Sequence, residues 1–428
     1  MPEKQLIDEC VHCGFCLPAC PTYQSWGKEM DSPRGRIYLM KSVTDGTAEL
    51  NATVVSHFDK CLGCMGCLPA CPSGVSYDAL IEQMRAEIEQ KYRRPLKDRL
   101  FRSMLFALLP YPARLKILLF VQLLYQKSGI QWLVRKLNLL AWAPRLAQLE
   151  RVMPSVDAGQ LRSRIPPLNL PRGAPRARVA LLSGCVQRLY FPQVNAATIR
   201  VLTAEGCEVV VPPDQGCCGA LSLHAGREPE ARAFARDLIE RFEGENLDAV
   251  IVNAAGCGSC MKEYGRLFIA DEGVRERAAR FAGKVRDVTE FLSALSPAAP
   301  RRPLNLRVAY HDACHLAHAQ GIRGQPRQLL RSIPGLSLQE IPSGDQCCGS
   351  AGIYNLVEPQ SAREIGTRKV DHLLSVKPEL MASANPGCTL QIQALLRERG
   401  MRLRVAHPIE ILDASLRGEP PEKIGRSD

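Results

Sequence analysis

Two groups of four cysteines near the start of the chain share one spacing. Each group reads C-x2-C-x2-C-x3-C and is followed by a proline; the groups are Cys10, Cys13, Cys16 and Cys20, then Cys61, Cys64, Cys67 and Cys71. Three closely spaced thiolates on a tight loop reach three irons of one cubane, whereas the fourth points toward a partner cluster. The spacing therefore predicts two [4Fe–4S] clusters that exchange their fourth ligands.

The exchange fixes the predicted ligand sets. Cluster one is assigned to Cys10, Cys13, Cys16 and Cys71, and cluster two to Cys61, Cys64, Cys67 and Cys20. Structural zinc sites use four ligands in two separated C-x2-C pairs and need no third close cysteine, so zinc is disfavoured here. Arg34 and Arg36, between the two motifs, are interpreted either as residues that raise a cluster potential or as partners of acidic neighbours.

A second set of cysteines forms an internal repeat of an isolated Cys, a CCG and a later Cys. The members are Cys185, Cys217, Cys218 and Cys257, then Cys314, Cys347, Cys348 and Cys388. Equivalent cysteines stand 129 to 131 positions apart, which indicates a duplicated unit. Four thiolates from three loops predict one further cluster per repeat, or a zinc, with reduced core cysteines as the alternative.

The elements that must position these cysteines alternate between strands and helices. Strand-like runs at 177–184, 247–256, 305–313 and 379–387 alternate with helical patterns at 229–244 and 361–378. This order predicts α/β units with largely parallel sheets. The repeat cysteines stand where the predicted strands end, which is where such sheets usually place ligands.

Other chemistry-bearing residues give weaker signals. His311, His315 and His318 surround Cys314, and we interpret them as ordinary polar residues rather than ligands. No G-x-G-x-x-G after a strand, phosphate loop or nucleophile elbow is present in the sequence. Substrate oxidation is therefore expected on another chain.

The net charge of +11 is concentrated in one apolar segment. From Lys91 to Lys136 there are eleven Lys and Arg and one acid, a local net charge of +10. Charges and prolines leave no run of roughly 20 uninterrupted apolar residues, so amphipathic helices are predicted instead of a membrane span. Two interpretations stay open: a connector packed on its own protein or on partner subunits, and attachment to an anionic membrane surface. Nucleic-acid binding is not expected, because no motif accompanies the basic strip.

Length and composition predict several domains in a globular chain of 428 residues, 46% hydrophobic and 23% charged. The predicted division is 1–90, a helical two-cluster ferredoxin-like domain; 91–150, a basic apolar helical connector; 151–176, a Pro/Arg-rich linker; 177–300 and 301–417, two α/β CCG repeats; and 418–428, a tail. The N-terminus lacks the features of a secretory signal. A cytoplasmic protein is expected, with peripheral contact at the inner membrane as the alternative, and its 18 cysteines are expected to bind metal rather than form disulfides.

Taken with the strings CVHCGFC, CPTYQ, DSPRGRIYL, CPSGV, MKEYG and CCGSAG, these motifs make the chain resemble the iron–sulfur subunits of bacterial glycolate oxidase over almost its whole length. More broadly it is similar to cysteine-rich subunits of heterodisulfide reductases, anaerobic glycerol-3-phosphate dehydrogenase and lactate-oxidising complexes. One departure is clear. The wider family closes each repeat with C-x-x-C, whereas Ala254 and Asn385 take the earlier position here, and Cys260 has no counterpart in the second repeat.

The resemblance implies a function in electron transfer. It implies that a separate FAD-containing subunit oxidises glycolate to glyoxylate and that this chain relays electrons one at a time toward quinone. The alternatives are another donor (lactate, glycerol 3-phosphate or a thiol–disulfide couple) and, in a different class, a non-enzymatic metal-binding scaffold or sensor. The missing C-x-x-C cysteines disfavour disulfide chemistry in the repeats.

Overall fold

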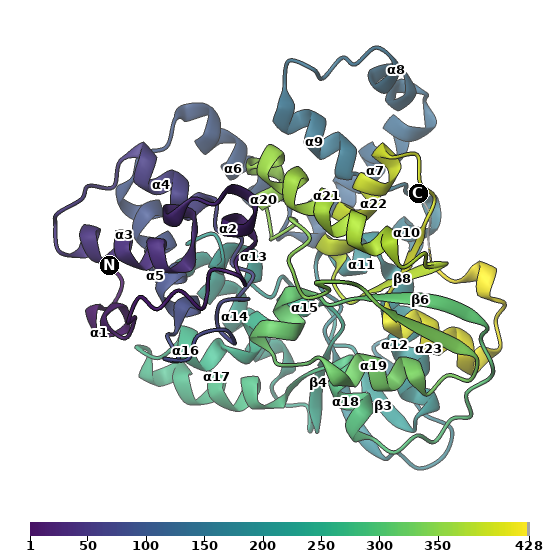
Figure 1. Ribbon diagram of the computed structural model, residues 1–428. Helices are drawn as coiled ribbons and strands as arrows, with labels where there is room; N and C mark the ends of the chain where they lie inside the picture. Colours follow the sequence, from purple (N-terminus) through teal and green to yellow (C-terminus); the bar gives the residue numbers. More distant parts are fainter. Residues whose placement is uncertain (426–428) are drawn as a thin grey trace.

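The computed structural model describes residues 1–425 and contains two similar α/β units (Figure 1). The first sheet has the order β1-β3-β2-β4-β5, and the second has the order β7-β6-β8-β9. Every neighbouring pair is parallel except β1 with β3. The strands are β1 (Leu168–Asn169), β2 (Ala177–Leu181), β3 (Cys207–Val210), β4 (Ala249–Val252), β5 (Val285–Asp287), β6 (Leu306–His311), β7 (Leu336–Glu340), β8 (Leu380–Ser383) and β9 (Arg404–Ala406).

The duplication seen in the sequence extends to the sheet topology. The order β3-β2-β4-β5 of the first unit matches the order β7-β6-β8-β9 of the second. The central strands β4 and β8 are buried along their whole length, as their continuous apolar sequences predict for parallel strands. The two predicted helices are also present, as α14 (Glu228–Phe242) and α21 (Pro359–Ser375). The predicted parallel α/β content is therefore confirmed.

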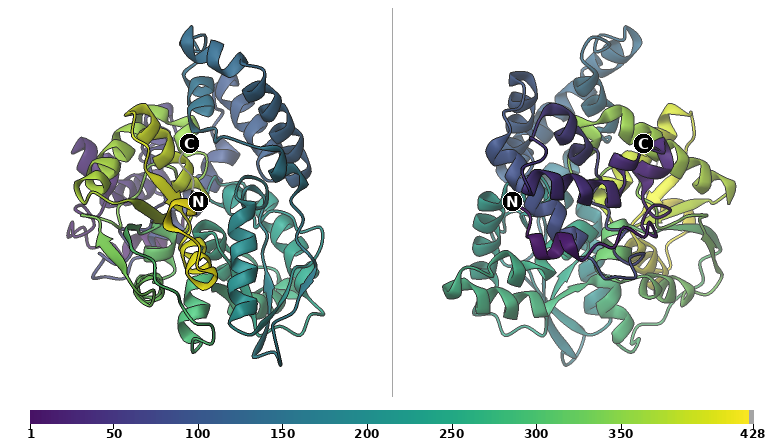
Figure 2. Two further views of the ribbon diagram at one scale, coloured as in Figure 1. Left: turned by 90° about the vertical axis from the view of Figure 1, so that its right-hand side faces the viewer. Right: turned by 60° about the vertical axis from the view of Figure 1, so that its left-hand side comes forward.

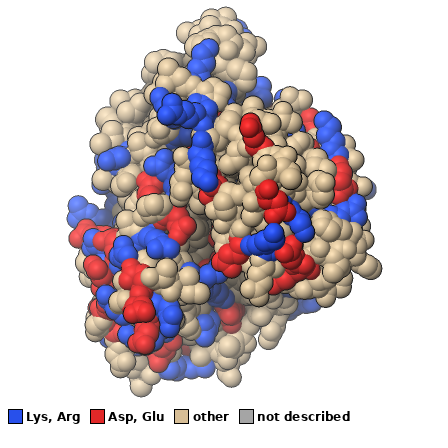
Figure 3. All heavy atoms as spheres, turned by 90° about the vertical axis from the view of Figure 1, so that its left-hand side faces the viewer, with Lys and Arg blue, Asp and Glu red and all other residues tan. Residues whose placement is uncertain are grey.

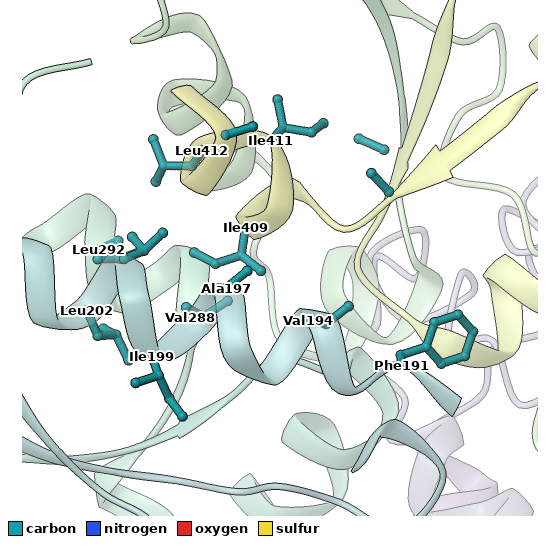
Figure 4. Close-up of a cluster of buried hydrophobic side chains, with 14 of the residues drawn as sticks. Phe191, Val194, Ala197, Ile199, Leu202, Val288, Leu292, Ile409, Ile411 and Leu412 are labelled. Atoms are coloured by element: carbon teal, nitrogen blue, oxygen red, sulfur yellow. The ribbon is translucent and has the colours of Figure 1, made fainter. Parts of the chain in front are cut away.

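The two units pack on each other through α12 (Pro192–Ala204), α18 (Val288–Ala294) and α23 (Pro408–Arg417), as Figure 4 shows. Ile199, Leu202 and Ile409 are buried in this contact and belong to a core shared by both sheets. At its edge, the guanidinium of Arg200 donates to both carboxylate oxygens of the buried Asp413. The contact holds the two repeats in a fixed relation.

The N-terminal helices form a cysteine-rich head that lies against both α/β units (Figures 1 and 2). Its core contains Met40, Phe58, Leu80 and Met84, which are fully buried. The cysteine loops lie between the helices, which are α1 (Lys4–Asp8), α2 (Pro21–Trp26), α3 (Pro33–Thr44), α4 (Ala52–Asp59) and α5 (Tyr77–Lys91).

The basic segment is helical, as its sequence predicts. It contains α6 (Leu96–Leu108), α7 (Pro112–Lys127), α8 (Ile130–Lys136) and α9 (Pro144–Val152). Across residues 1–425, no single helix is long and apolar enough to cross a bilayer; α6 and α7 reach that length and composition only together, and the chain bends by 102° between them. Segment 151–176 includes the helix α10 (Ala158–Arg162), whose N-terminus has a capping box formed by Asp157 and Gln160, and the edge strand β1.

The remaining α-helices surround the sheets. They are α11 (Val186–Tyr190), α13 (Ala220–Leu223), α15 (Ala255–Lys262), α16 (Tyr264–Leu267), α17 (Glu272–Lys284), α19 (Gly324–Arg331), α20 (Tyr354–Val357) and α22 (Pro386–Glu398).

Candidate metal centres

The four cysteines predicted for cluster one line a single cavity of the head. They are Cys10, Cys13, Cys16 and Cys71. His12 and Gly14 in its loop have φ values of 55° and 88°, and the equivalent residues of the second loop, Gly63 and Met65, have φ values of 57° and 60°. The two loops thus share a left-handed turn at the same two positions. Residues other than glycine rarely adopt this backbone conformation, which turns each loop around its cavity.

The four cysteines predicted for cluster two line the adjacent cavity. They are Cys20, Cys61, Cys64 and Cys67. Cys67 and Tyr77 line both cavities, so the two sets are immediate neighbours. A side chain at Gly66 would meet the carbonyl oxygen of Ala19 at 3.1 Å, which explains the small residue there.

Arg36 is the main charge at the second cavity. Its side chain is only 1% exposed and donates to the carbonyl oxygen of His57 at 2.7 Å and to the Thr22 hydroxyl at 3.3 Å, with Asp31 3.9 Å away. Burial raises the pKa of the Cys61 thiol, but Arg36 and Arg85 outweigh burial, so the pKa is lowered overall. The buried guanidinium therefore favours thiolate, the form that binds metal.

Arg34 is placed differently. It forms two hydrogen bonds to the Glu29 carboxylate, at 2.7 and 3.0 Å, and one to the carbonyl oxygen of His12. Arg34 thus binds an acidic neighbour, as one interpretation predicts, whereas Arg36 lies beside the thiols, and its effect on a cluster potential stays a prediction.

The head cysteines fit a pair of iron–sulfur clusters. Among residues 1–425 every cysteine is free, with no disulfide to compete for the sulfurs. Each cavity is lined by the four predicted cysteines, three from one motif and one from the other, together with an arginine; Cys67 of the second set also borders the first cavity. This donor set satisfies the requirement of a cubane for four thiolates.

The repeat cysteines gather at the ends of the parallel strands. In the first unit, the sulfurs of Cys185 and Cys217 are 3.7 Å apart. In the second unit, Cys348, Cys388 and a ring nitrogen of His311 lie within 4.8 Å of one another. The CCG motif follows β3 in the first unit and β7 in the second, and these two strands hold equivalent places in their sheets. Each unit therefore offers a compact sulfur-rich site.

Cys260 and Cys207 lie outside these two groupings. The thiol of Cys260 is buried and donates to the carbonyl oxygen of Cys218 at 3.6 Å, and burial raises its pKa well above the usual range. Cys207 belongs to the hydrophobic core at the start of β3.

The head docks on the second repeat through its cysteine loops. Cys64 and Cys347 line the same cavity, together with His318. The Nε2 atom of His315 lies 2.9 Å from the carbonyl oxygen of Gly63. The second cavity of the head is therefore adjacent to the cysteine site of the second repeat, although their residues are almost 300 positions apart in the sequence.

The head also contacts the first repeat, through α5. Arg85 donates to the carbonyl oxygen of His224 at 2.8 Å, and Arg266 pairs with Glu82 at 3.1 Å. Burial raises the pKa of Glu82 to about 7, despite the nearby arginines. The contact between the head and the first repeat is therefore made by charged side chains and the backbone of His224, whereas the contact with the second repeat brings cysteines of the two parts together.

The three histidines around Cys314 have different environments. His315 and His318 each have an Nε2 atom 2.9 Å from a backbone carbonyl oxygen, which agrees with their interpretation as ordinary polar residues. His311 is fully buried beside two cysteines, whereas the sequence interpretation treated it, like the other two histidines, as an ordinary polar residue. The buried Lys369, whose ammonium donates to the carbonyl oxygen of Gly344, was not named in the sequence interpretation. Residue-by-residue comparison of the repeats would have found both.

The connector exposes a broad apolar face next to basic residues. Leu115 and Leu119 of α7 are fully buried, whereas on the outer side Phe120 is 51% exposed, Trp132 62% and Trp142 80%. The protruding end of the molecule that contains α8 shows Lys and Arg atoms and no acidic atoms at its tip (Figure 3). Closer to the body, the basic residues are paired with acids, as in the Arg94–Asp59 and Arg102–Asp98 ion pairs.

Comparison with protein families agrees with this layout. The 4Fe–4S dicluster domain matches residues 6–75, and the cysteine-rich (CCG) domain matches residues 179–262 and 308–393. These two domain types define the chain as an iron–sulfur protein, with iron–sulfur clusters as its cofactors. The linker region of the glycolate oxidase iron–sulfur subunit matches residues 97–153.

Full-length relatives identify the family. The chain is 39% identical to the probable glycolate oxidase iron–sulfur subunit of Bacillus subtilis, over 96% of this chain and 94% of that one. It is 36% identical to the glycolate oxidase iron–sulfur subunit of Escherichia coli, over 98% of this chain and 96% of that one. Lactate utilization protein A of Oceanobacillus iheyensis is 30% identical over 56% of this chain and 98% of its own length. The chain belongs to the family of glycolate oxidase iron–sulfur subunits.

Proposed function

We propose that this chain relays single electrons from an FAD-containing subunit that oxidises glycolate, through three adjoining cysteine sites, toward quinone. The observation that carries this proposal is the continuity of the sites. Cys67 borders both cavities of the head, and Cys64 shares a cavity with Cys347 of the second repeat. An iron–sulfur cluster supplies a one-electron site whose potential depends on nearby charge, hydrogen bonds and solvent exposure.

The proposed ligand sets follow the cavities. Cluster one is held by Cys10, Cys13, Cys16 and Cys71; cluster two by Cys61, Cys64, Cys67 and Cys20; and the repeat centres by Cys185, Cys217, Cys218 and Cys257 and by Cys314, Cys347, Cys348 and Cys388. The chain holds these sulfurs in place from rigid elements: two loops in the head, and strand ends in the repeats. The second-repeat site lies on the proposed path because it adjoins the head. This contact is made by the cysteine loops of the head, whereas the first repeat contacts the head through α5.

Electrons enter at the first cavity, where the surface is open. Cys13 is exposed, and the neighbouring Val11 and Phe15 are each 67% exposed. Large exposed apolar side chains beside a redox site are typical of a surface that another subunit covers. The flavoprotein subunit is therefore proposed to dock on this loop.

The path is tested by interrupting it in the reconstituted complex. Cys347→Ser is expected to leave glycolate-dependent reduction of the head clusters intact and to abolish reduction of a quinone analogue. Cys217→Ser, the same change at the equivalent position of the first repeat, is the matched control and should retain quinone reduction. Loss of quinone reduction in Cys217→Ser alone would contradict the proposed route. Glycolate oxidation by the purified chain without any flavoprotein would contradict the subunit assignment.

The connector is proposed to dock on an anionic bilayer surface, which brings the chain near the quinone pool. Its exposed tryptophans suit the membrane interface, and Lys and Arg near an anionic surface contribute about 1 kcal/mol each. Charge complementarity favours this occupant over a second copy of the chain, which would present the same basic surface.

Vesicle sedimentation tests the docking of the connector. The Trp132→Ser/Trp142→Ser variant should lose binding to vesicles containing phosphatidylglycerol while keeping its fold, because both side chains are exposed. Pure phosphatidylcholine vesicles should bind wild type weakly. Equal binding of both vesicle types, or a dimer that the substitutions abolish, would refute the bilayer as the occupant.

A further inference from the structure

We propose that His311 binds the metal centre of the second repeat together with Cys348 and Cys388, so that the two repeats hold chemically different centres. The inference rests on the proposed metal site of the second repeat and specifies its ligands. It starts from a comparison of the two repeats, which share sheet order and cysteine placement but differ in side chains at the site.

His311 has no other role to explain its burial. It ends β6, next to Ser383 of β8, and its side chain is fully buried. Within residues 1–425, neither of its ring nitrogens has a hydrogen-bond partner. Burying an imidazole without partners is costly, and such groups in folded proteins call for an explanation.

The sulfurs supply that explanation. Ligand atoms of His311, Cys348 and Cys388 lie within 4.8 Å of one another, and all three side chains are buried. Separations of this size suit donors around a common metal centre, because metal–sulfur and metal–nitrogen bonds of about 2.3 and 2.1 Å place two ligands of one ion within about 4 Å. The neutral imidazole nitrogen donates a lone pair in the same manner as in known histidine-ligated zinc and iron–sulfur sites.

The first repeat has an apolar residue at the same position. The matching strand pairings make Val179 of the first repeat equivalent to Val308 of the second, and Leu182 is therefore the equivalent of His311. Leu182 is buried in the hydrophobic cluster of the first unit. The first-repeat site therefore has four cysteines and no histidine, whereas the second has four cysteines and His311.

A second difference reinforces the first. Gly219 and Gly349 each approach the carbonyl of an alanine, Ala231 and Ala362 respectively, and this shared contact aligns α14 with α21. In this alignment, the buried Lys369 takes the place of the buried Leu238 of the first repeat. The second site thus gains a cation and a neutral donor.

The asymmetry has a consequence for the redox potential. The buried cation favours the reduced, more negative form of an iron–sulfur centre, and the neutral histidine adds a ligand without adding negative charge. The second-repeat centre is therefore expected to have a more positive midpoint potential than an all-cysteine centre in the same fold.

The test uses the full chain, purified without oxygen and labelled with ¹⁵N-histidine. Pulsed EPR of the reduced protein, or X-ray absorption if the bound metal is zinc, should detect a directly bound nitrogen in wild type. The signal should be lost in His311→Leu, the variant that copies the first repeat, and retained in the control His315→Gln. His311→Cys should keep the metal without the nitrogen and shift an iron centre to a more negative potential.

Separate outcomes address the site and the ligand. Metal content that is unchanged in Cys347→Ser would show that the second repeat does not bind metal, and the proposed centre would fail with the inference. Metal that is lost in Cys347→Ser, with no bound nitrogen in wild type or with a nitrogen signal that persists in His311→Leu, would overturn the inference alone. If His311→Leu does not fold, as judged by circular dichroism, His311→Cys decides the question.

Discussion

Replacing Arg36 with Met should lower the midpoint potential of the second head cluster. Arg36 lies beside Cys20 and Cys61 in a cavity wall and is almost completely buried, so its charge is poorly screened by water. A positive charge stabilises the reduced, more negative state of a cluster. Met keeps much of the side-chain volume and removes the charge.

The size of the shift follows from Coulomb's law. A unit charge at ~4 Å in a medium of effective dielectric constant ~20 contributes about 4 kcal/mol. For one electron, about 1.4 kcal/mol corresponds to about 59 mV, so the upper limit is about 170 mV. The values chosen for the distance and the dielectric constant give the largest effect, and rearrangement of the remaining charged side chains, Lys60 and Asp31, opposes part of it. We expect a shift on the order of 100 mV toward negative potential.

The assay is a potentiometric titration followed by EPR. Arg36→Lys, which keeps the charge, should shift the potential much less and separates charge from packing. Arg34→Met is the control in the first cavity, where Glu29 already neutralises the arginine. Iron content must match wild type in each variant. An unchanged potential in Arg36→Met, or an equal shift in Arg34→Met, would refute the electrostatic role of Arg36.

Three further predictions concern the repeats. Gly349→Ala should reduce metal binding in the second repeat and lower thermal stability more than Gly219→Ala does. Both glycines have positive φ, but the added Cβ at position 349 would clash with the carbonyl oxygen of Ala362, whereas at position 219 it would lie 3.0 Å from that of Ala231. Equal effects in thermal unfolding would contradict this. Arg200→Met should weaken the contact between the repeats by about 2 kcal/mol, because the buried Asp413 loses a partner that binds both of its oxygens, although it keeps Arg417. Chemical unfolding measures the loss, and a change below ~0.5 kcal/mol would count against it. Burial raises the pKa of Asp287 from 3.8 to about 6. Between these pH values the folded state keeps a proton that the unfolded state releases, so the free energy of unfolding falls as pH rises through this window. The free energy of unfolding of Asp287→Asn should therefore rise relative to wild type by on the order of 2 kcal/mol between pH 4 and pH 6, with no further relative rise above pH 7.

The local chemistry of the head could be predicted from the sequence because cubane ligation imposes a spacing on nearby residues. The two loops even share their left-handed positions, His12 with Gly63 and Gly14 with Met65. The duplication could also be predicted, because equivalent cysteines recur at nearly constant intervals. Their place at the ends of predicted strands indicated where the ligands would lie, as is usual in α/β folds.

The relation between the head and the repeats could not be predicted. The proximity of Cys64 to Cys347 depends on how the head docks, which is decided by contacts such as Trp26 with Glu364 rather than by any local pattern. The buried side of the connector was also hidden, because apolar residues occur on all sides of α7 and only packing distinguishes Leu119 from its exposed neighbour Phe120.

The most direct test of the electron path is a count of metals in the full chain purified without oxygen. Iron, acid-labile sulfide and zinc are measured together, and the same count is made on Cys347→Ser. Two cubanes in the head account for about eight irons. We predict more metal than this in wild type, with the excess reduced in Cys347→Ser. About eight irons, no zinc and no change in the variant would contradict a path that continues into the second repeat.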